Sequence, residues 1–104
     1  MRSSYFLAAV VSSVLVTSTA FAATTNYAGH ELAGKAKITI EQARAIALKA
    51  HAGNITDEEL EKEKGGGGLR YSFDIRHGKV TQEVGVDAVT GKVLENAPEG
   101  PNAD

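Results

Sequence analysis

The sequence of 104 residues contains no cysteine, no tryptophan and only two prolines. The missing cysteines exclude a disulfide-stapled scaffold and any thiolate metal site. Basic charge is also scarce, because 11 lysines and arginines stand against 13 aspartates and glutamates, and a net charge of −2 gives no electrostatic reason to bind nucleic acid. A chain of this length holds at most one domain. These absences leave a small soluble module.

The first 22 residues differ in kind from the rest, because Arg2 is their only charge and two apolar runs follow it. This pattern is typical of a secretory signal peptide. Small residues, Ala20 and Ala22, occupy the positions that signal peptidase requires for a cut between Ala22 and Ala23. The apolar part is shorter than the ~20 residues that span a bilayer. We therefore expect residues 1–22 to be removed, with no membrane anchor left, and the product to be periplasmic or secreted.

Cleavage would leave 82 residues of the 104, and only part of them is patterned for folding. Residues 23–36 mix small and polar side chains without a period, which predicts a flexible leader, and residues 98–104 predict a flexible tail. The folded domain is then expected over residues 37–97. A domain near this size buries only about 60% of its unfolded surface and is marginally stable.

A helix is predicted from about Ile40 to His51. Thr39 and Gln42 have the spacing of a capping box at its start, and Gly53 is expected to end it in a left-handed conformation. The apolar positions recur at helical spacing and form one stripe: Ile40, Ala43, Ile46, Ala47 and Ala50. The charged residues are expected largely off this stripe: Glu41, Arg44 and Lys49.

Two hairpins are predicted after the helix. Apolar and polar residues alternate strictly from Leu69 to Arg76, as in a half-buried strand. A two-residue turn at His77-Gly78 would place Phe73 opposite Gln82 in the next strand. A second turn over residues 87–92 precedes a short edge strand over residues 92–95. The predicted fold class is α+β, with one N-terminal helix packed on a three- to four-stranded antiparallel β-meander.

The charged segment from Ile55 to Lys64 allows two interpretations. Thr56 and Glu59 have capping-box spacing, which favours a helix. Its only apolar anchors are Ile55 and Leu60, five residues apart, and these form no helical stripe. We favour a charged edge strand, because charge protects an open edge from association, with the four glycines at 65–68 as a linker to the next strand.

The sequence offers no catalytic constellation. Ser72 is the only serine after residue 22, and no histidine is placed to act as its base. Asp74, Glu83 and Asp87 share the polar face of the predicted sheet, but one helix on one sheet leaves little room for a cleft. We predict a protein that is not an enzyme.

No cofactor or metal site is predicted either. The glycines at 65–68 lack the Gly-Lys-Ser/Thr ending of a phosphate-binding loop. The histidines have no short ligand spacing among them: His30, His51 and His77. The acidic run that begins at Asp57 is interpreted as solvated charge on an edge element.

The helix segment, the strand LRYSFDI and above all the hairpin sequence VGVDAVTGKVL at 84–94 resemble the PepSY domain, whose signature includes an Asp-Ala-x-Thr-Gly-x-Val-Leu hairpin. The resemblance covers about Lys37 to Asn96. It implies an α+β module that inhibits or modulates a peptidase, or that senses the cell envelope by binding protein. It also implies a strand over the segment that begins at Ile55, and it carries no catalytic or metal motif.

We therefore expect an exported, non-catalytic module that binds a protein partner, with any peptidase acting in trans. The expected surface is the outward face of the sheet: Arg70, Ser72, Asp74, Arg76, Thr81 and Glu83. The exposed edge beside Val93 is an alternative surface and a route to a homo-oligomer. The alternative function is an envelope module that binds a small ligand or metal cation without inhibiting a peptidase. An accessory domain without inhibitory activity also stays open.

Overall fold

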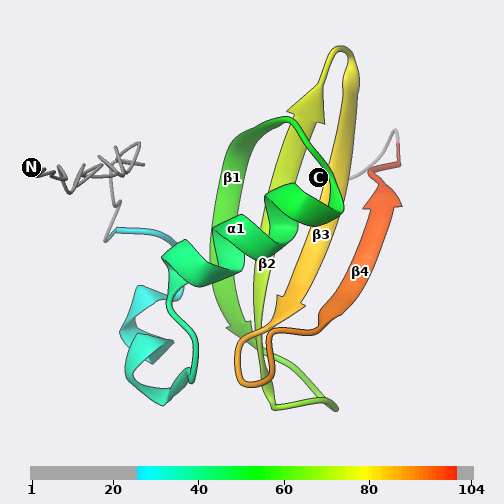
Figure 1. Ribbon diagram of the computed structural model, residues 1–104. Helices are drawn as coiled ribbons and strands as arrows, with labels where there is room; N and C mark the ends of the chain where they lie inside the picture. Colours follow the sequence, from blue (N-terminus) through cyan, green and yellow to red (C-terminus); the bar gives the residue numbers. More distant parts are fainter. Residues whose placement is uncertain (1–25, 101–104) are drawn as a thin grey trace, which may run out of the picture.

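The computed structural model describes residues 26–100, and the predicted signal peptide with its cut between Ala22 and Ala23 lies outside them. The elements follow one another as a short 3-10 helix, an α-helix and four strands (Figure 1): η1 His30–Lys35, α1 Ile40–Ala50, β1 Asn54–Lys62, β2 Leu69–His77, β3 Val80–Asp87 and β4 Val93–Pro98. Within residues 26–100, no helix has the length and apolarity needed to cross a bilayer.

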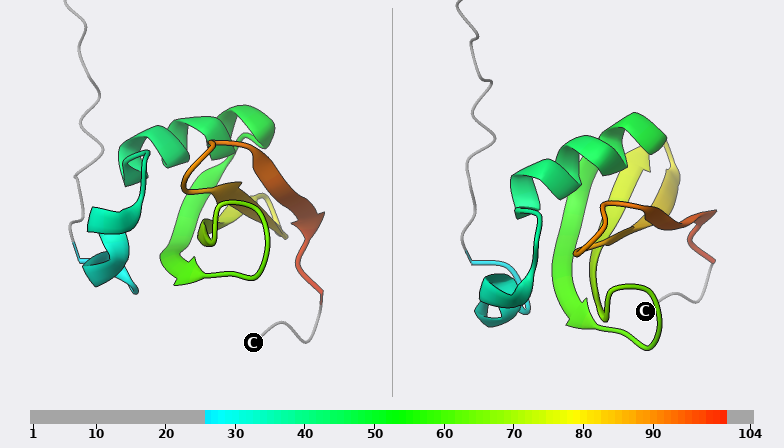
Figure 2. Two further views of the ribbon diagram at one scale, coloured as in Figure 1. Left: turned by 90° about the horizontal axis from the view of Figure 1, so that it is seen from below. Right: turned by 60° about the horizontal axis from the view of Figure 1, so that its bottom comes forward.

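The strands form one antiparallel sheet in the order β1-β2-β3-β4, and α1 lies across one of its faces (Figures 1 and 2). The core fills the space between α1 and this face. Its largest fully buried side chains are apolar except for one aspartate: Tyr71, Phe73, Ile75, Val84, Val86 and Asp87. The predicted α+β fold, one helix on an antiparallel meander, is confirmed.

The start of α1 is built as its sequence predicts. Thr39 Oγ1 accepts the Gln42 N–H at 3.1 Å, and Gln42 Oε1 accepts the Thr39 N–H at 2.8 Å. The end of α1 differs, because the cap is His51 in an extended conformation (φ −151°) and Gly53 is not a left-handed stop. Gly53 instead permits close packing, since a Cβ there would lie 2.7 Å from the Arg76 carbonyl oxygen.

The buried side of α1 also differs from the predicted stripe. Ile40, Ala43 and Ala47 are buried as expected, but Ala50 is exposed. Arg44 was expected off the stripe, yet its side chain is only 4% exposed. It is buried because a carboxylate on β1 pairs with it across the helix–sheet interface.

The charged segment after α1 is an edge strand, so the favoured interpretation of residues 55–64 is confirmed. β1 pairs with β2 alone among the named strands, and Leu60 is its buried anchor. The glycines that follow form the linker, and Gly65, Gly66 and Gly68 have positive φ angles that suit a tight turn.

The first hairpin keeps its two-residue turn, but the turn is Gly78-Lys79 and the pairing shifts by two residues. Phe73 lies opposite Val84, not Gln82 as predicted. The shift preserves which side chains face the core, because strand side chains alternate with a period of two. It is favoured because it places two fully buried residues opposite each other and puts Gly78, at φ 64°, in the first turn position.

The expected flexible leader over 23–36 is wrong for its described part. Tyr27 is buried against Tyr71, with ring centroids 6.4 Å apart, and residues 30–35 form η1. Ala28 also bridges to β1 in a parallel arrangement. Tyr27, together with the partly buried Leu32 and Ala36, therefore packs this segment against the core.

The expected tail over 98–104 begins inside the sheet. β4 extends to Pro98, and the Glu99 N–H donates to the Thr81 carbonyl at 2.8 Å. Residues 101–104 lie outside the described residues.

Candidate functional site

The sheet face away from α1, called the open face below, gathers most of the carboxylates of the protein. The register places Asp74 opposite Glu83 across β2 and β3, and opposite Asp57 across β2 and β1. Contacts with Arg70 add carboxylates from the loop after β1 and from β4. The charged residues of the open face are eight acids and two arginines: Asp57, Glu59, Glu61, Glu63, Asp74, Glu83, Glu95, Glu99, Arg70 and Arg76.

Arg70 occupies the centre of the open face. Its Nη1 contacts Glu63 Oε1 at 3.1 Å, and its Nη2 pairs with Glu95 and lies 3.8 Å from Glu83 Oε2. The guanidinium lies flat over Gly85, where an added Cβ would come within 2.6 Å of Nε. Burial acts to lower the pKa of Arg70, but the hydrogen bond and charge of Glu95 outweigh it and raise that pKa. One cation on β2 thus contacts carboxylates from β3, from β4 and from the loop after β1.

The remaining carboxylates exceed what the two arginines can neutralise. A hydrogen bond with Glu61, followed by burial and the charges of Glu61 and Asp57, raises the pKa of Glu59 to about 7. Burial, with the charges of Glu95 and Asp74, also raises the pKa of Glu83. Crowded carboxylates take up protons because each charge disfavours the next. The open face therefore has a surplus of negative charge that a cationic partner would relieve.

Three acids of the open face could in principle approach a cation together. Ligand atoms of Asp74, Glu83 and Glu99 all lie within 4.8 Å of one another, and the three residues are half-buried. Oxygen ligands in this arrangement suit a hard divalent ion. Exposed acidic groups are often clustered without an ion, so the cluster alone assigns no metal. None of the histidines belongs to such a cluster in residues 26–100.

The residues of the predicted binding surface do lie on one face of the sheet, but they differ in solvent exposure. Arg76 lies opposite Thr81 and Asp74 opposite Glu83, so residues from β2 and β3 do share one side. Ser72, however, is only 9% exposed, because it lies between Arg70 and Glu61 and hydrogen-bonds to both. Arg76 is the exposed member, and the other four are half-buried.

Sequence reasoning missed the carboxylates that β1 and β4 add to this face. A usable signal was present, since Asp57, Glu59, Glu61 and Glu63 are spaced by two and must share one side of a strand. The run was interpreted as solvated edge charge because each acid was considered without its neighbours across the sheet.

Asp87 does not join the open face, contrary to the prediction that it lies there with Asp74 and Glu83. Its side chain turns into the second hairpin, is 2% exposed, and accepts the N–H groups of Gly67, Val89 and Thr90 at 2.8, 2.8 and 3.1 Å. Burial acts to raise the pKa of Asp87, but these backbone hydrogen bonds outweigh it and lower that pKa. Asp87 therefore holds two loops together and is not a binding group.

One comparison with known proteins gives a match. The family model described as PepSY, the peptidase propeptide and YPEB domain, matches residues 37–96. No curated protein and no solved structure matches the chain. The matched range holds α1 and the sheet except for the last residues of β4.

Proposed function

Since the chain belongs to the PepSY family, we propose that it is an exported, non-catalytic module that binds a peptidase and restrains it. Family membership supports a propeptide-like role at a general level. We propose in addition that this chain acts on a separate peptidase in the cell envelope. The periplasm is the proposed location, because residues 1–22 have the pattern of a signal peptide.

The observation that carries the proposal is the negative charge surplus of the open face. A sheet is a rigid platform, and the face opposite α1 presents its side chains without a covering helix among residues 26–100. Charged surfaces choose partners by complementary potential. The surface of the peptidase that docks here is therefore expected to be rich in lysine and arginine.

The central ion pairs give the face a fixed shape before it meets a partner. Arg70 holds Glu63 and Glu95 in place and lies 3.8 Å from Glu83. A hydrogen bond with Glu61 raises the pKa of Glu59 and burial raises the pKa of Glu83, and neighbouring carboxylate charges add to both shifts. A lysine or arginine of the partner that approaches the latter pair would lower their pKa values and gain favourable Coulomb energy. This predicts association that weakens as salt screens the two surfaces.

The test is an inhibition assay with the envelope peptidases of the source cell. Purified protein is titrated into each peptidase, with casein as substrate, and the initial rate is measured at low and high salt. The proposal expects at least one peptidase to slow in a saturable way, with less inhibition at high salt. If every peptidase keeps its full rate at all concentrations, the proposed function is wrong.

A further inference from the structure

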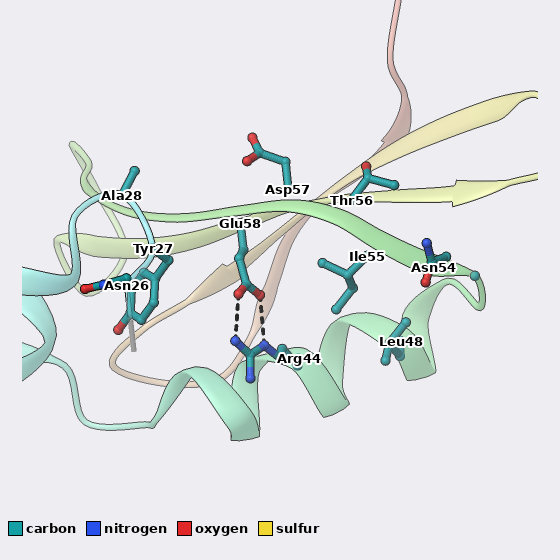
Figure 3. A pocket seen from close by; sticks show the side chains of 11 residues that line it. Asn26, Tyr27, Ala28, Arg44, Leu48, Asn54, Ile55, Thr56, Asp57 and Glu58 are labelled. Carbon is teal, nitrogen blue, oxygen red and sulfur yellow. Dashed lines mark hydrogen bonds and ion pairs between the residues drawn. The ribbon is translucent and has the colours of Figure 1, made fainter. Parts of the chain in front are cut away.

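A groove lies between α1 and β1, away from the open face (Figure 3). Its volume is about 460 Å³, which is within the range of ligand sites in proteins. Leu48 on α1 and Ile55 on β1 point toward each other across it, and Tyr27 closes one end (Figure 3). The half-buried aliphatic walls suit an apolar side chain.

The groove runs along the outer edge of β1. Among residues 26–100, the outer side of this strand has one partner, Ala28, which bridges to Glu59 in parallel. The Leu60 N–H donates to the Ala28 carbonyl at 2.8 Å. β1 therefore already pairs with one backbone residue on this side. From residue 54 to residue 57 it continues beside the groove with no partner strand from the described residues.

The polar wall of the groove argues against a charged guest. Arg44 and Glu58 meet in a two-point ion pair across it, so each charge is met by the other (Figure 3). A charged side chain from outside would have to compete with this pair and lose its own hydration. An uncharged aliphatic side chain needs only the contact with Leu48 and Ile55.

From these features we propose that the groove binds an extended peptide segment of a partner protein. The segment adds to the outer edge of β1 over residues 54–57, in line with Ala28, and places one aliphatic side chain between Leu48 and Ile55. Strand addition is a common way to bind peptides, with affinity from the backbone and selectivity from side-chain pockets. The inference goes beyond the proposed function and does not rest on it. Asp57 borders both surfaces, but the groove lies between α1 and β1 and the open face lies on the other side of the sheet.

The test uses a blocked pentapeptide, acetyl-Thr-Leu-Thr-Leu-Thr-amide, titrated to about 1 mM into the isotope-labelled protein and followed by amide NMR shifts. The expected result is saturable shifts confined to residues 26–28, to residues 54–60 and to the amides near Leu48. Peptides with aspartate in place of leucine, or with N-methylated leucines that cannot donate backbone hydrogen bonds, should bind at least about tenfold more weakly.

Two variants with the same chemical change separate the groove from the rest of the surface. Leu48→Glu should weaken binding about tenfold or more, whereas Leu94→Glu, on the strand at the opposite edge of the sheet, should leave it unchanged. The N-methylated peptide provides a second test if Leu48→Glu fails to fold. Absence of binding, shifts elsewhere, or equal binding of the N-methylated peptide would overturn the proposal. Self-association through β1 without peptide, seen by sedimentation, would assign the groove to a second copy and overturn it too.

Discussion

Arg44 on α1 and Glu58 on β1 form a two-point ion pair across the helix–sheet interface. Arg44 Nε donates to Oε1 at 2.8 Å and Nη2 to Oε2 at 2.6 Å, with the side chains 4% and 14% exposed. The hydrogen bond to Glu58 is the main reason that the pKa of Arg44 is raised, although burial acts against it. The pair fixes the helix to the edge strand, where the alanine stripe of α1 offers little contact area.

Breaking this pair is expected to destabilise the domain. Arg44→Ala should lower the free energy of unfolding by about 2–4 kcal/mol, because the Glu58 carboxylate stays partly buried without its counter-charge. Lys49→Ala on the exposed side of the same helix is the control and should change it by less than ~0.5 kcal/mol. Urea denaturation measures the free energy of unfolding of both variants. An equal loss in the two variants would contradict a stabilising role for the ion pair.

Asp87 is expected to be a major stabilising residue although it lies in a turn. Asp87→Ala should cost about 2–4 kcal/mol, since three backbone N–H groups lose a charged acceptor, and Asp87→Asn should cost less because one acceptor oxygen is kept. Because its pKa is lowered in the folded state, its contribution is present above the unfolded pKa and is lost as acid protonates it. Urea midpoints of the wild type and both variants at pH 7 and at about pH 3 test this.

The crowding on the open face predicts an unusual pH dependence. The folded pKa of Glu59, about 7, is above its ordinary value of 4.5, so the folded state binds the extra proton between these pH values. Its contribution is therefore complete below pH 4.5 and is lost as pH rises through about 7. Glu59→Gln should be more stable than wild type by ~1 kcal/mol at pH 8, and the difference should vanish in acid.

Glu31→Gln is the matched control for this pH effect, since Glu31 lies on η1. It should leave the dependence of the urea midpoint on pH between pH 4 and 8 as in wild type. A carbon NMR titration of the Glu59 carboxyl gives the direct reading. A midpoint at the ordinary glutamate value would contradict the described crowding.

Two glycines should respond oppositely to a methyl group. Gly53→Ala is expected to cost about 2 kcal/mol, because the new Cβ would lie 2.7 Å from the Arg76 carbonyl oxygen and 2.8 Å from Ile75 Cγ2. Gly34→Ala on η1 should be close to neutral, since nothing lies within 4 Å of its Cβ position. Melting temperatures compare the two, and an unchanged value for Gly53→Ala would mean that the close approach is relaxed in solution.

Local patterns predicted the elements of this fold well because each depends on neighbouring residues. The capping box at Thr39 and the alternation from Leu69 to Arg76 are short-range signals, and both elements form where predicted. Helix propensity alone would have predicted the wrong structure for residues 55–64. Their capping-box spacing favours a helix, but Leu60 can be buried only if the segment pairs with β2.

The larger errors concern residues that meet from distant parts of the chain. Arg44 was expected off the apolar stripe, because its partner, Glu58, is 14 residues away. The pairing of Phe73 with Val84 and the burial of Tyr27 likewise depend on packing that one segment does not reveal. The acids of the open face can be found strand by strand in the sequence. Only the strand order β1-β2-β3-β4 shows that acids of different strands lie side by side.

Our central proposal is that the open face binds a peptidase and restrains it. The decisive measurement is the inhibition constant of the wild type against the peptidase it slows, compared with those of two double variants. Glu59→Gln with Glu83→Gln should weaken inhibition by about tenfold or more, because it removes two of the crowded carboxylates from the face. Glu31→Gln with Glu41→Gln makes the same chemical change on η1 and α1 and should leave the inhibition constant unchanged. An equal loss in both double variants, or no loss in either, would contradict the claim that the open face is the binding surface.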